Sequence, residues 1–328
     1  MTKIDKEQAE KALKQEYDEA LEDEKNWVPE DREAWKKRKR LIRNEESRKI
    51  FSQVFDKPTL ETIEELARKK YIDQVEFVIA TGKEGNVFRC KAGNEFLALK
   101  IYKVETSDFK HMMDYINGDE RFKDVRKDKL EIVKAWTKKE YRNLEDFTRA
   151  RVRVPLPIIS IRNCLLMEFI GKDGVAAPRA KDKPFLDPQK QYTLMCEYMA
   201  RMVNAKVVHS DMSEYNIMNN EEEMVIIDVG QAVSTLHPKA QEFFERDLLN
   251  MSKWFAKQGV ETDYDQMYLA VKMKAAQLKD AKAELEEEIK KGKEIIITPQ
   301  TKADTERRKV RAAKTTAQRK KSNAKKKK

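Results

Sequence analysis

The chain has 328 residues, of which 38% are charged and only nine each are Gly and Pro, a composition that favours a helix-rich protein with strongly solvated faces. Its longest apolar runs fall far below the roughly 18 residues of a membrane span, and its mixed-charge N-terminus has no apolar stretch, so we expect no membrane contact and no secretory signal. Three widely spaced cysteines, Cys90, Cys164 and Cys196, form no disulfide or metal framework, which favours a cytoplasmic protein.

The first part of the chain, residues 1–50, is polar and rich in charge, with a basic run at 32–43 that carries Trp35. We interpret it as a helical extension. The next segment, residues 59–72, predicts a helix with Thr59 as its N-cap. The apolar residues of this helix recur at helical spacing: Leu60, Ile63, Leu66 and Ala67.

Residues 75–103 change to an alternation of period two, which predicts three antiparallel strands with one turn at 92–94 and the other at 81–86. Gly82 and Gly85 lie in the second turn, where glycine lets backbone N–H groups approach an anion. Two glycines are also ordinary hairpin residues. The turn gains interest from Lys100, which stands in the apolar run FLALKIY, because a lysine in a buried strand needs a counter-charge.

That counter-charge is predicted in a helix over 129–149. Glu140 is the one carboxylate on its apolar face, which otherwise holds Val133, Trp136, Leu144 and Phe147. A glutamate at the edge of the stripe that reaches solvent is the alternative. The intervening residues 105–128 are charged and predict a long irregular loop, with His111 on the surface.

Two strands are predicted at 154–160 and 164–169, and the chain leaves the second at Gly171. We interpret this point as a hinge whose backbone groups at Glu168 and Ile170 would meet an adenine. Residues 188–204 predict a helix whose methionines form core rather than a metal site.

The stretch from Val207 to Gly230 reads VVHSDMSEYNIMNNEEEMVIIDVG. Asp211 is followed five residues later by Asn216, and Asp228 ends an apolar strand. Carboxylate and amide oxygens suit Mg²⁺, which binds few protein ligands together with phosphate oxygens. The spacing is that of a kinase catalytic loop followed by a metal-binding Asp-x-Gly. A polar turn between two strands is the plainer interpretation.

After Asp228 the chain reaches Pro238 without the long activation segment of ordinary protein kinases. Pro238 predicts the first turn of a helix that Gly259 ends, with a stripe of Phe244, Leu248, Met251 and Phe255. A long charged helix over 263–291 follows. Residues 302–328 hold 13 Lys and Arg against 2 Asp and Glu, so the net charge of +10 belongs to this tail and the other 301 residues sum to −1. We expect a disordered arm that is either merely solvated or binds RNA or another polyanion.

These segments in this order resemble the RIO family of atypical protein kinases, in its type-1 branch, over about residues 50–260. The phrases that carry the resemblance are ATGKEGNVF, LALKIY, GDERF, WTKKEYRNLE, LLMEFIGKDG, VHSDMSEYNIM and IIDVGQAV. The phrase VFDKPTLETI and the short acidic N-terminus look closer to archaeal than to animal members.

The resemblance implies an α+β, reduced bilobal kinase fold: a small antiparallel-sheet N-lobe over 51–170, a mostly helical C-lobe over 171–262, a charged helix over 263–300 and the tail from 301. It implies ATP and Mg²⁺ as cofactors and a role in maturation of the small ribosomal subunit, with the pre-ribosomal particle and its RNA as partners. The implied roles are phosphate binding for Lys100, orientation for Glu140, catalytic base for Asp211, metal ligands for Asn216 and Asp228, and a phosphoaspartate at Asp228. The implied ATP-binding residues are Thr81, Gly82, Lys83, Glu84, Gly85, Asn86, Val87, Lys100, Met167, Glu168 and Ile170.

The chain departs from ordinary kinases at two positions of the catalytic loop. Ser210 stands where many kinases have Arg, and Ser213 stands where they carry a Lys that stabilises the transferring group. Gly85 replaces the Ala of the family phrase, for which we expect only extra backbone freedom. These departures favour slow ATP hydrolysis over rapid peptide phosphorylation. A small-molecule kinase of the aminoglycoside or choline type and a non-catalytic RNA-binding scaffold are the alternatives.

Overall fold

The computed structural model describes residues 57–290 except 105–107, 123–124 and 127. The predictions for residues 1–50 and for the tail at 302–328 lie outside these residues. The chain divides into two compact units after Ala275, and everything below concerns the first unit unless stated. No helix in the described part of the chain is long and apolar enough to cross a membrane.

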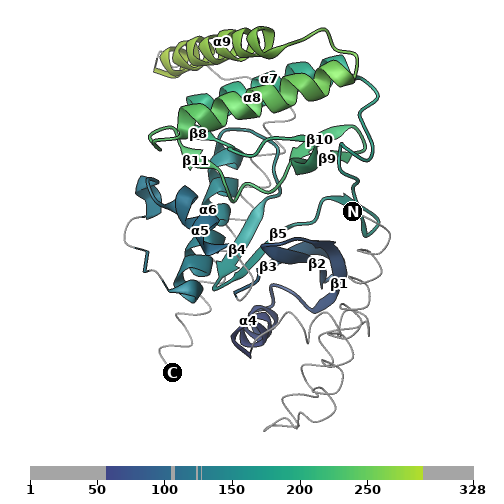
Figure 1. The fold of residues 1–328 in the computed structure, drawn as a ribbon. Coiled ribbons are helices and arrows are strands. Elements are labelled where there is room, and N and C mark those ends of the chain that lie inside the picture. Colours follow the sequence, from purple (N-terminus) through teal and green to yellow (C-terminus); the bar gives the residue numbers. More distant parts are fainter. Residues whose placement is uncertain (1–56, 105–107, 123–124, 127, 291–328) are drawn as a thin grey trace, which may run out of the picture. The chain divides into compact units, whose positions relative to one another are not determined.

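The first half of the described chain is built on a five-stranded antiparallel sheet (Figure 1) with the order β1-β2-β3-β5-β4. Strands β1 (Gln74–Thr81), β2 (Gly85–Ala92) and β3 (Glu95–Tyr102) confirm the predicted meander. The two-residue connection at Gly93 and Asn94 confirms the predicted turn, because Gly93 takes a positive φ of 64°. Strands β4 (Pro157–Ile161) and β5 (Cys164–Glu168) complete the sheet.

Helix α4 (Lys57–Arg68) packs on this sheet through the predicted stripe, with Ile63 and Leu66 buried. The predicted N-cap is wrong. Thr59 lies inside the helix and is itself buried, and its hydroxyl accepts a hydrogen bond of 2.8 Å from Asn163 Nδ2. Thr59 therefore binds Asn163, in the turn between β4 and β5, instead of capping the helix. The local sequence does not reveal this distant partner.

The segment predicted as an irregular loop at 105–128 contains helix α5 (Phe109–Ile116) and the 3₁₀ turn η1 (Glu120–Phe122). Helix α5 buries Met112, Tyr115 and Ile116 in one core cluster with Trp136 and Phe243. The sequence analysis missed this helix because eight residues give only about two turns of periodicity, and charged residues surround them. Asp108 caps α5 by accepting a hydrogen bond from the backbone N–H of His111.

Helix α6 (Lys129–Arg149) starts at its N-cap Asp128 and lies along β4. Every residue of its predicted stripe is buried, including Glu140. A fully buried aromatic such as Trp136 contributes on the order of 2 kcal/mol or more from apolar surface removed from water.

The second half of the described unit is mostly helical. After the short hairpin β6 (Gly171–Lys172) and β7 (Val175–Ala176), α7 (Pro188–Asn204) buries Met195, Met199 and Met202 as predicted. Two small antiparallel pairs follow: β8 (Val207–Val208) with β11 (Val233–Ser234), and β9 (Ile217–Asn220) with β10 (Glu223–Ile226). The expected α+β division into a sheet-rich and a helical part is confirmed.

Helix α8 (Ala240–Lys257) starts two residues after Pro238, so the prediction that this proline opens the helix is wrong. The ring of His237 instead stabilises the start of the helix, since its Nδ1 accepts a hydrogen bond of 3.2 Å from the N–H of the N-cap residue Lys239. Phe243 is buried and Phe244 only partly buried, and Gly259 ends the helix with a φ of 87° as expected. Helix α9 (Tyr264–Lys290) confirms the long charged helix and spans the boundary between the units.

Candidate active site

Three charged side chains that are far apart in sequence meet at one point. Lys100 of β3 donates hydrogen bonds from Nζ to both carboxylate oxygens of Glu140, at 2.8 and 3.0 Å. The same ammonium reaches Asp228 Oδ1 at 2.9 Å. The predicted Lys100–Glu140 pair is therefore present, and Asp228 joins it.

The electrostatics of this cluster keep Lys100 charged. Burial works to lower the pKa of Lys100, but Asp228 and Glu140 raise it above its ordinary value. Lys100 in turn lowers the pKa of Asp228. Burial raises the pKa of the fully enclosed Glu140. Asp228 is thus ionised, and it is the member of the cluster that faces outward, with 51% of its side chain exposed.

The loop after β8 holds the next group of residues, and helix α8 holds that loop. Asp247 accepts hydrogen bonds of 2.8 Å from the backbone N–H groups of Ser210 and Met212, on either side of Asp211. The neighbouring Arg246 donates to the Ser210 carbonyl. Ser210 has a positive φ of 70°, so its backbone depends on these contacts.

The sequence analysis did not identify Asp247 or Arg246. The usable clue was a carboxylate within the apolar face of α8, next to Leu248. Asp247 is 1% exposed, and burial raises its pKa to about 7.

Asp211 and Asn216 are directly joined. Asn216 donates from Nδ2 to the Asp211 carbonyl at 2.8 Å and to Asp211 Oδ2 at 3.0 Å, and Gln231 Nε2 lies 3.3 Å from the same Oδ2. Burial and the charge of Asp228 raise the pKa of Asp211. His209 is a buried neutral ring, since burial lowers its pKa to about 4.

The arrangement fits Mg²⁺. Both side-chain hydrogen bonds of Asn216 are donated by Nδ2, which leaves the side-chain oxygen Oδ1 as an acceptor, and Asp228 supplies a carboxylate. No cluster of three or more His, Cys, Asp or Glu in the described residues has metal-binding geometry. Two protein oxygen ligands suit Mg²⁺, which completes its shell with substrate phosphates and water.

The turn between β1 and β2 closes on itself, because the Gly82 N–H donates to the Gly85 carbonyl at 2.9 Å. The exposed part of the turn is Thr81, Gly82 and Lys83, whereas Asn86 is buried. The expectation for Gly85 is corrected: a Cβ at this position would lie 2.4 Å from the Ile101 carbonyl oxygen. Glycine is needed here for close approach of β2 and β3 rather than for freedom.

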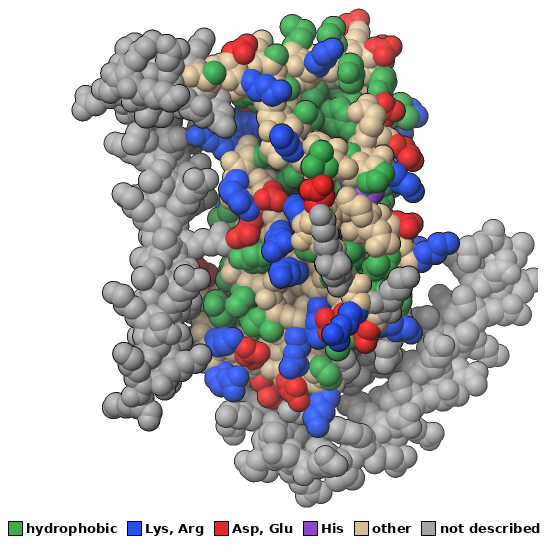
Figure 2. Space-filling model, turned by 90° about the vertical axis from the view of Figure 1, so that its left-hand side faces the viewer, with side chains coloured by type: hydrophobic (Ala, Val, Ile, Leu, Met, Phe, Trp, Pro, Cys, Tyr) green, Lys and Arg blue, Asp and Glu red, His purple; other side chains and the backbone are tan. Residues whose placement is uncertain are grey.

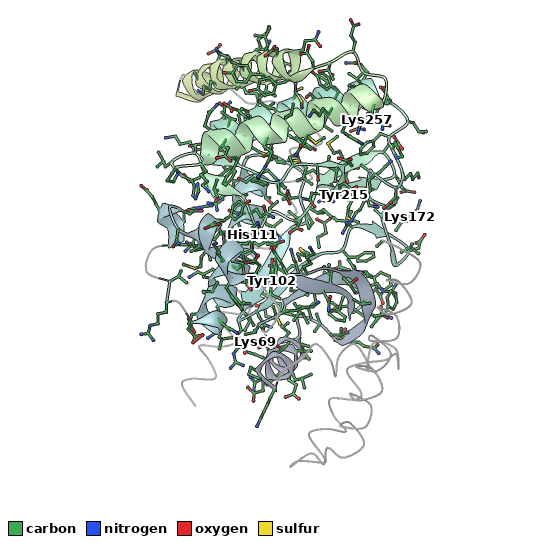
Figure 3. The ribbon with its side chains drawn as sticks, in the orientation of Figure 1. Lys69, Tyr102, His111, Lys172, Tyr215 and Lys257 are labelled. Carbon is green, nitrogen blue, oxygen red and sulfur yellow. The ribbon has the colours of Figure 1, made fainter. Side chains whose placement is uncertain are left out.

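Glu84 of this turn faces inward, and burial raises its pKa against the opposing effect of Lys100. His111 lies beside it, with Nδ1 3.7 Å from Glu84 Oε1, so it is more than the surface histidine expected from the sequence. Its side chain is 40% exposed and its ring stands against Tyr115. In Figure 3, His111 and Tyr215 of the catalytic loop lie between the five-stranded sheet and helix α8.

The predicted hinge at the end of β5 is held by side-chain contacts that the sequence did not indicate. Arg153 makes a two-pronged ion pair with Glu168, with both N–O distances at 2.8 Å. The Ile170 carbonyl accepts a hydrogen bond from the Ala177 N–H at 3.0 Å and is therefore engaged. An adenine would therefore have to contact other backbone groups of the hinge, such as the Ile170 N–H. Of the other predicted ATP-binding residues, Met167 lies on β5 and Val87 lies on β2.

Comparison with known proteins places this geometry in context. The profile of the RIO domain matches residues 86–267. The RIO-type serine/threonine-protein kinase Rio1 of Haloferax volcanii is 43% identical over 221 residues, which cover 67% of this chain and 76% of that protein. The protein of the same name in Thermoplasma acidophilum is 40% identical over 188 residues, 57% of this chain and 100% of that protein.

The human serine/threonine-protein kinase RIO1 is 34% identical over 225 residues, which cover 67% of this chain but 40% of that protein. Among solved structures, the Rio2 kinase–ADP/Mg²⁺–phosphoaspartate complex from Chaetomium thermophilum superposes with a TM-score of 0.51 at 20% identity and covers 67% of both chains. That likeness shows a shared fold, and both archaeal relatives are more similar in sequence than the human one.

Proposed function

The chain belongs to the RIO family of serine/threonine kinases, and we propose that it uses ATP and Mg²⁺ in a slow hydrolytic cycle through a phosphoaspartate at Asp228. The contact of Lys100 with both Glu140 and Asp228 is the observation that carries this proposal. It places a fixed cation and an ionised carboxylate side by side, as phosphoryl transfer requires.

Within the cycle, Lys100 binds the phosphates and Glu140 holds its ammonium in place. Asn216 and Asp228 would hold Mg²⁺, which neutralises phosphate charge when bound. The turn at 81–87 would contact the phosphates, and the hinge at 167–170 would receive the adenine.

The covalent step uses a carboxylate oxygen of Asp228. That oxygen attacks the γ-phosphorus, the bond from this phosphorus to the β,γ-bridging oxygen breaks, and ADP leaves with the electron pair. Three features support a nucleophilic role: Lys100 lowers the pKa of Asp228, half of its side chain is exposed, and carboxylates serve as nucleophiles in aspartyl-phosphate ATPases. The Rio2 structure cited above is a phosphoaspartate complex of that protein.

Asp211 then acts as the base for hydrolysis. It accepts a proton from water as the water oxygen attacks the acyl phosphate, which releases inorganic phosphate and restores Asp228. Burial and the charge of Asp228 raise the pKa of Asp211, which makes its carboxylate a better proton acceptor than an ordinary aspartate. The short segment between Asp228 and α8, and Ser213 in place of a lysine, offer little to a peptide acceptor.

Trapping with γ-labelled ATP tests the cycle. We expect a hydroxylamine-sensitive label on wild-type protein that is absent from Asp228→Asn and more abundant in Asp211→Ala. Lys257→Ala, on the exposed end of α8, serves as a control with unchanged labelling. Label found only on serine or threonine, with generic peptides turned over at about 1–100 per second, would establish a conventional kinase instead.

We further propose a pre-small-ribosomal-subunit particle and its RNA as partners, with the tail at 302–328 as the contact. The support is charge: the tail has a net +11, whereas one face of the described residues mixes Lys, Arg, Asp and Glu (Figure 2). Deleting 302–328 should weaken RNA binding and flatten its salt dependence, because phosphate contacts release counterions. An unchanged salt titration would reduce the tail to a solubilising segment, and ATP hydrolysis should stay the same in either case.

A further inference from the structure

The backbone that follows Asp228 is tied to helix α6 by side chains outside the predicted site. Lys139 Nζ donates to the Gly230 carbonyl at 2.9 Å and also to the Ala232 carbonyl. Asn143, one turn further along α6, donates from Nδ2 to the carbonyls of Val229 at 2.7 Å and Ala232 at 3.0 Å. Two residues of one helix thus bind three carbonyl oxygens of this loop, those of Val229, Gly230 and Ala232.

Both donors are completely enclosed, since Lys139 and Asn143 are each 0% exposed. Enclosing a lysine is costly unless its ammonium is well bonded, and burial lowers the pKa of Lys139 to about 7 while Asp119 opposes this effect. The loop lies so close to α6 that a Cβ on Gly230 would stand 3.3 Å from Glu140 Oε2 and from Trp136 Nε1.

A third donor reaches the same loop from the turn before α6. Arg121 Nη2 lies 3.4 Å from the Ala232 carbonyl, and the guanidinium is held by Asp119 at 2.7 Å and Asp146 at 2.8 Å. The Ala232 carbonyl is therefore the point where side chains of η1 and α6 converge.

Asp228 has a backbone that needs such support. Its φ is 58°, a left-handed conformation that is unfavourable for a non-glycine residue and persists only where the surroundings enforce it. The next fixed element, β11, begins only at Val233.

We propose that Lys139 and Asn143 are positioning residues of the metal site, which hold the loop of Val229 to Ala232 against α6 and so keep the Asp228 carboxylate beside Lys100. The inference rests on the proposed use of Mg²⁺ and ATP. Helix α6 then has two functions: Glu140 orients Lys100, and Lys139 and Asn143 orient the metal ligand Asp228.

The test compares Lys139→Met and Asn143→Ala with Lys138→Met, an exposed lysine of the same helix. Calorimetric titration with ADP, with and without Mg²⁺, reports on the metal site without turnover. We expect Lys139→Met and Asn143→Ala to bind metal-free ADP like the wild type. Their affinity for ADP in the presence of Mg²⁺ should fall about 10- to 100-fold, as when a residue that orients a metal ligand is removed. The half-saturating Mg²⁺ concentration for ATP hydrolysis should rise in parallel, and Lys138→Met should match the wild type.

A lowered melting temperature with an unchanged Mg²⁺ effect on ADP binding would overturn the proposal, because a purely structural role predicts that result. If Lys139→Met does not fold, Asn143→Ala decides alone, since it removes two hydrogen bonds without leaving or removing a charge. Failure of the proposed function is distinguishable: the wild type itself would then show no effect of Mg²⁺ on ADP binding.

Discussion

Glu140 and Asp247 are two buried carboxylates of the same site, and their partners differ. Each is 1% exposed, and burial raises the pKa of each to about 7. Glu140 accepts hydrogen bonds from a side chain, Lys100, that also contacts Asp228. Asp247 accepts two hydrogen bonds from backbone N–H groups on either side of Asp211.

The difference separates two functions of a buried acid. A carboxylate paired with a side-chain cation sets the position of a group that must act on phosphate. A carboxylate bonded to amides sets the path of the backbone and leaves the chemistry to its neighbours. Removing the first should therefore damage catalysis more than folding, and removing the second should damage folding at least as much as catalysis.

The largest effect is expected from removing Lys100, the partner of Glu140. Lys100→Ala should lower ATP turnover about 10²- to 10³-fold, the usual loss when one preorganised electrostatic group is removed. The fold should persist because Glu140 can take up a proton once its cation is gone. Steady-state ATPase assays and circular dichroism check both parts, and turnover within a factor of two of the wild type would refute the assignment of Lys100. Asp228→Ala should behave alike.

On the other side, Asp247→Ala strands the N–H groups of Ser210 and Met212. Each buried donor left without a partner costs about 1–3 kcal/mol, so we expect a clear fall in the free energy of unfolding in urea. Asp247→Asn keeps one acceptor oxygen and should lose less. Equal stability of Asp247→Ala and the wild type would show that these amides do not depend on Asp247.

Gly85→Ala sharpens the comparison by disturbing the Lys100 strand without touching a charge. The added Cβ meets a backbone carbonyl at 2.4 Å, so β2 or β3 must shift, at about 1–3 kcal/mol for overpacking. The Michaelis constant for ATP should rise, since Lys100 lies one residue before Ile101 on β3. A variant with wild-type melting temperature and Michaelis constant would show that the turn absorbs the methyl group.

The smallest expected effect is a dependence on pH. Because the folded pKa of Asp247, about 7, lies above its ordinary value of 3.8, the folded state retains a proton that the unfolded state has released. The stabilisation is therefore complete below about pH 4 and is lost as pH rises toward and through about 7. The free energy of unfolding should fall more steeply between these limits in the wild type than in Asp247→Asn. Parallel curves for the two proteins would contradict the raised pKa.

Much of the site was predictable because its signals are local. The meander, the lysine in an apolar strand, the glutamate on an apolar helix face and the spacing of Asp211, Asn216 and Asp228 all depend on short-range periodicity. The structure brings these five residues together. The short helix α5 was missed because its two turns lie among charges, and Thr59 was misassigned because its partner, Asn163, is 104 positions away.

The sequence by itself determined the strand meander, the long helices and the family, since alternation and motif spacing act over a few residues. Tertiary structure alone decided which charge meets which: Lys100 and Asp228 are 128 positions apart, and Lys139 and Gly230 are 91 positions apart. The physical reason is that pairing, burial and pKa depend on distance through space and on access to water. Periodicity can show that a side chain faces the core, but only the packed structure shows what it meets there.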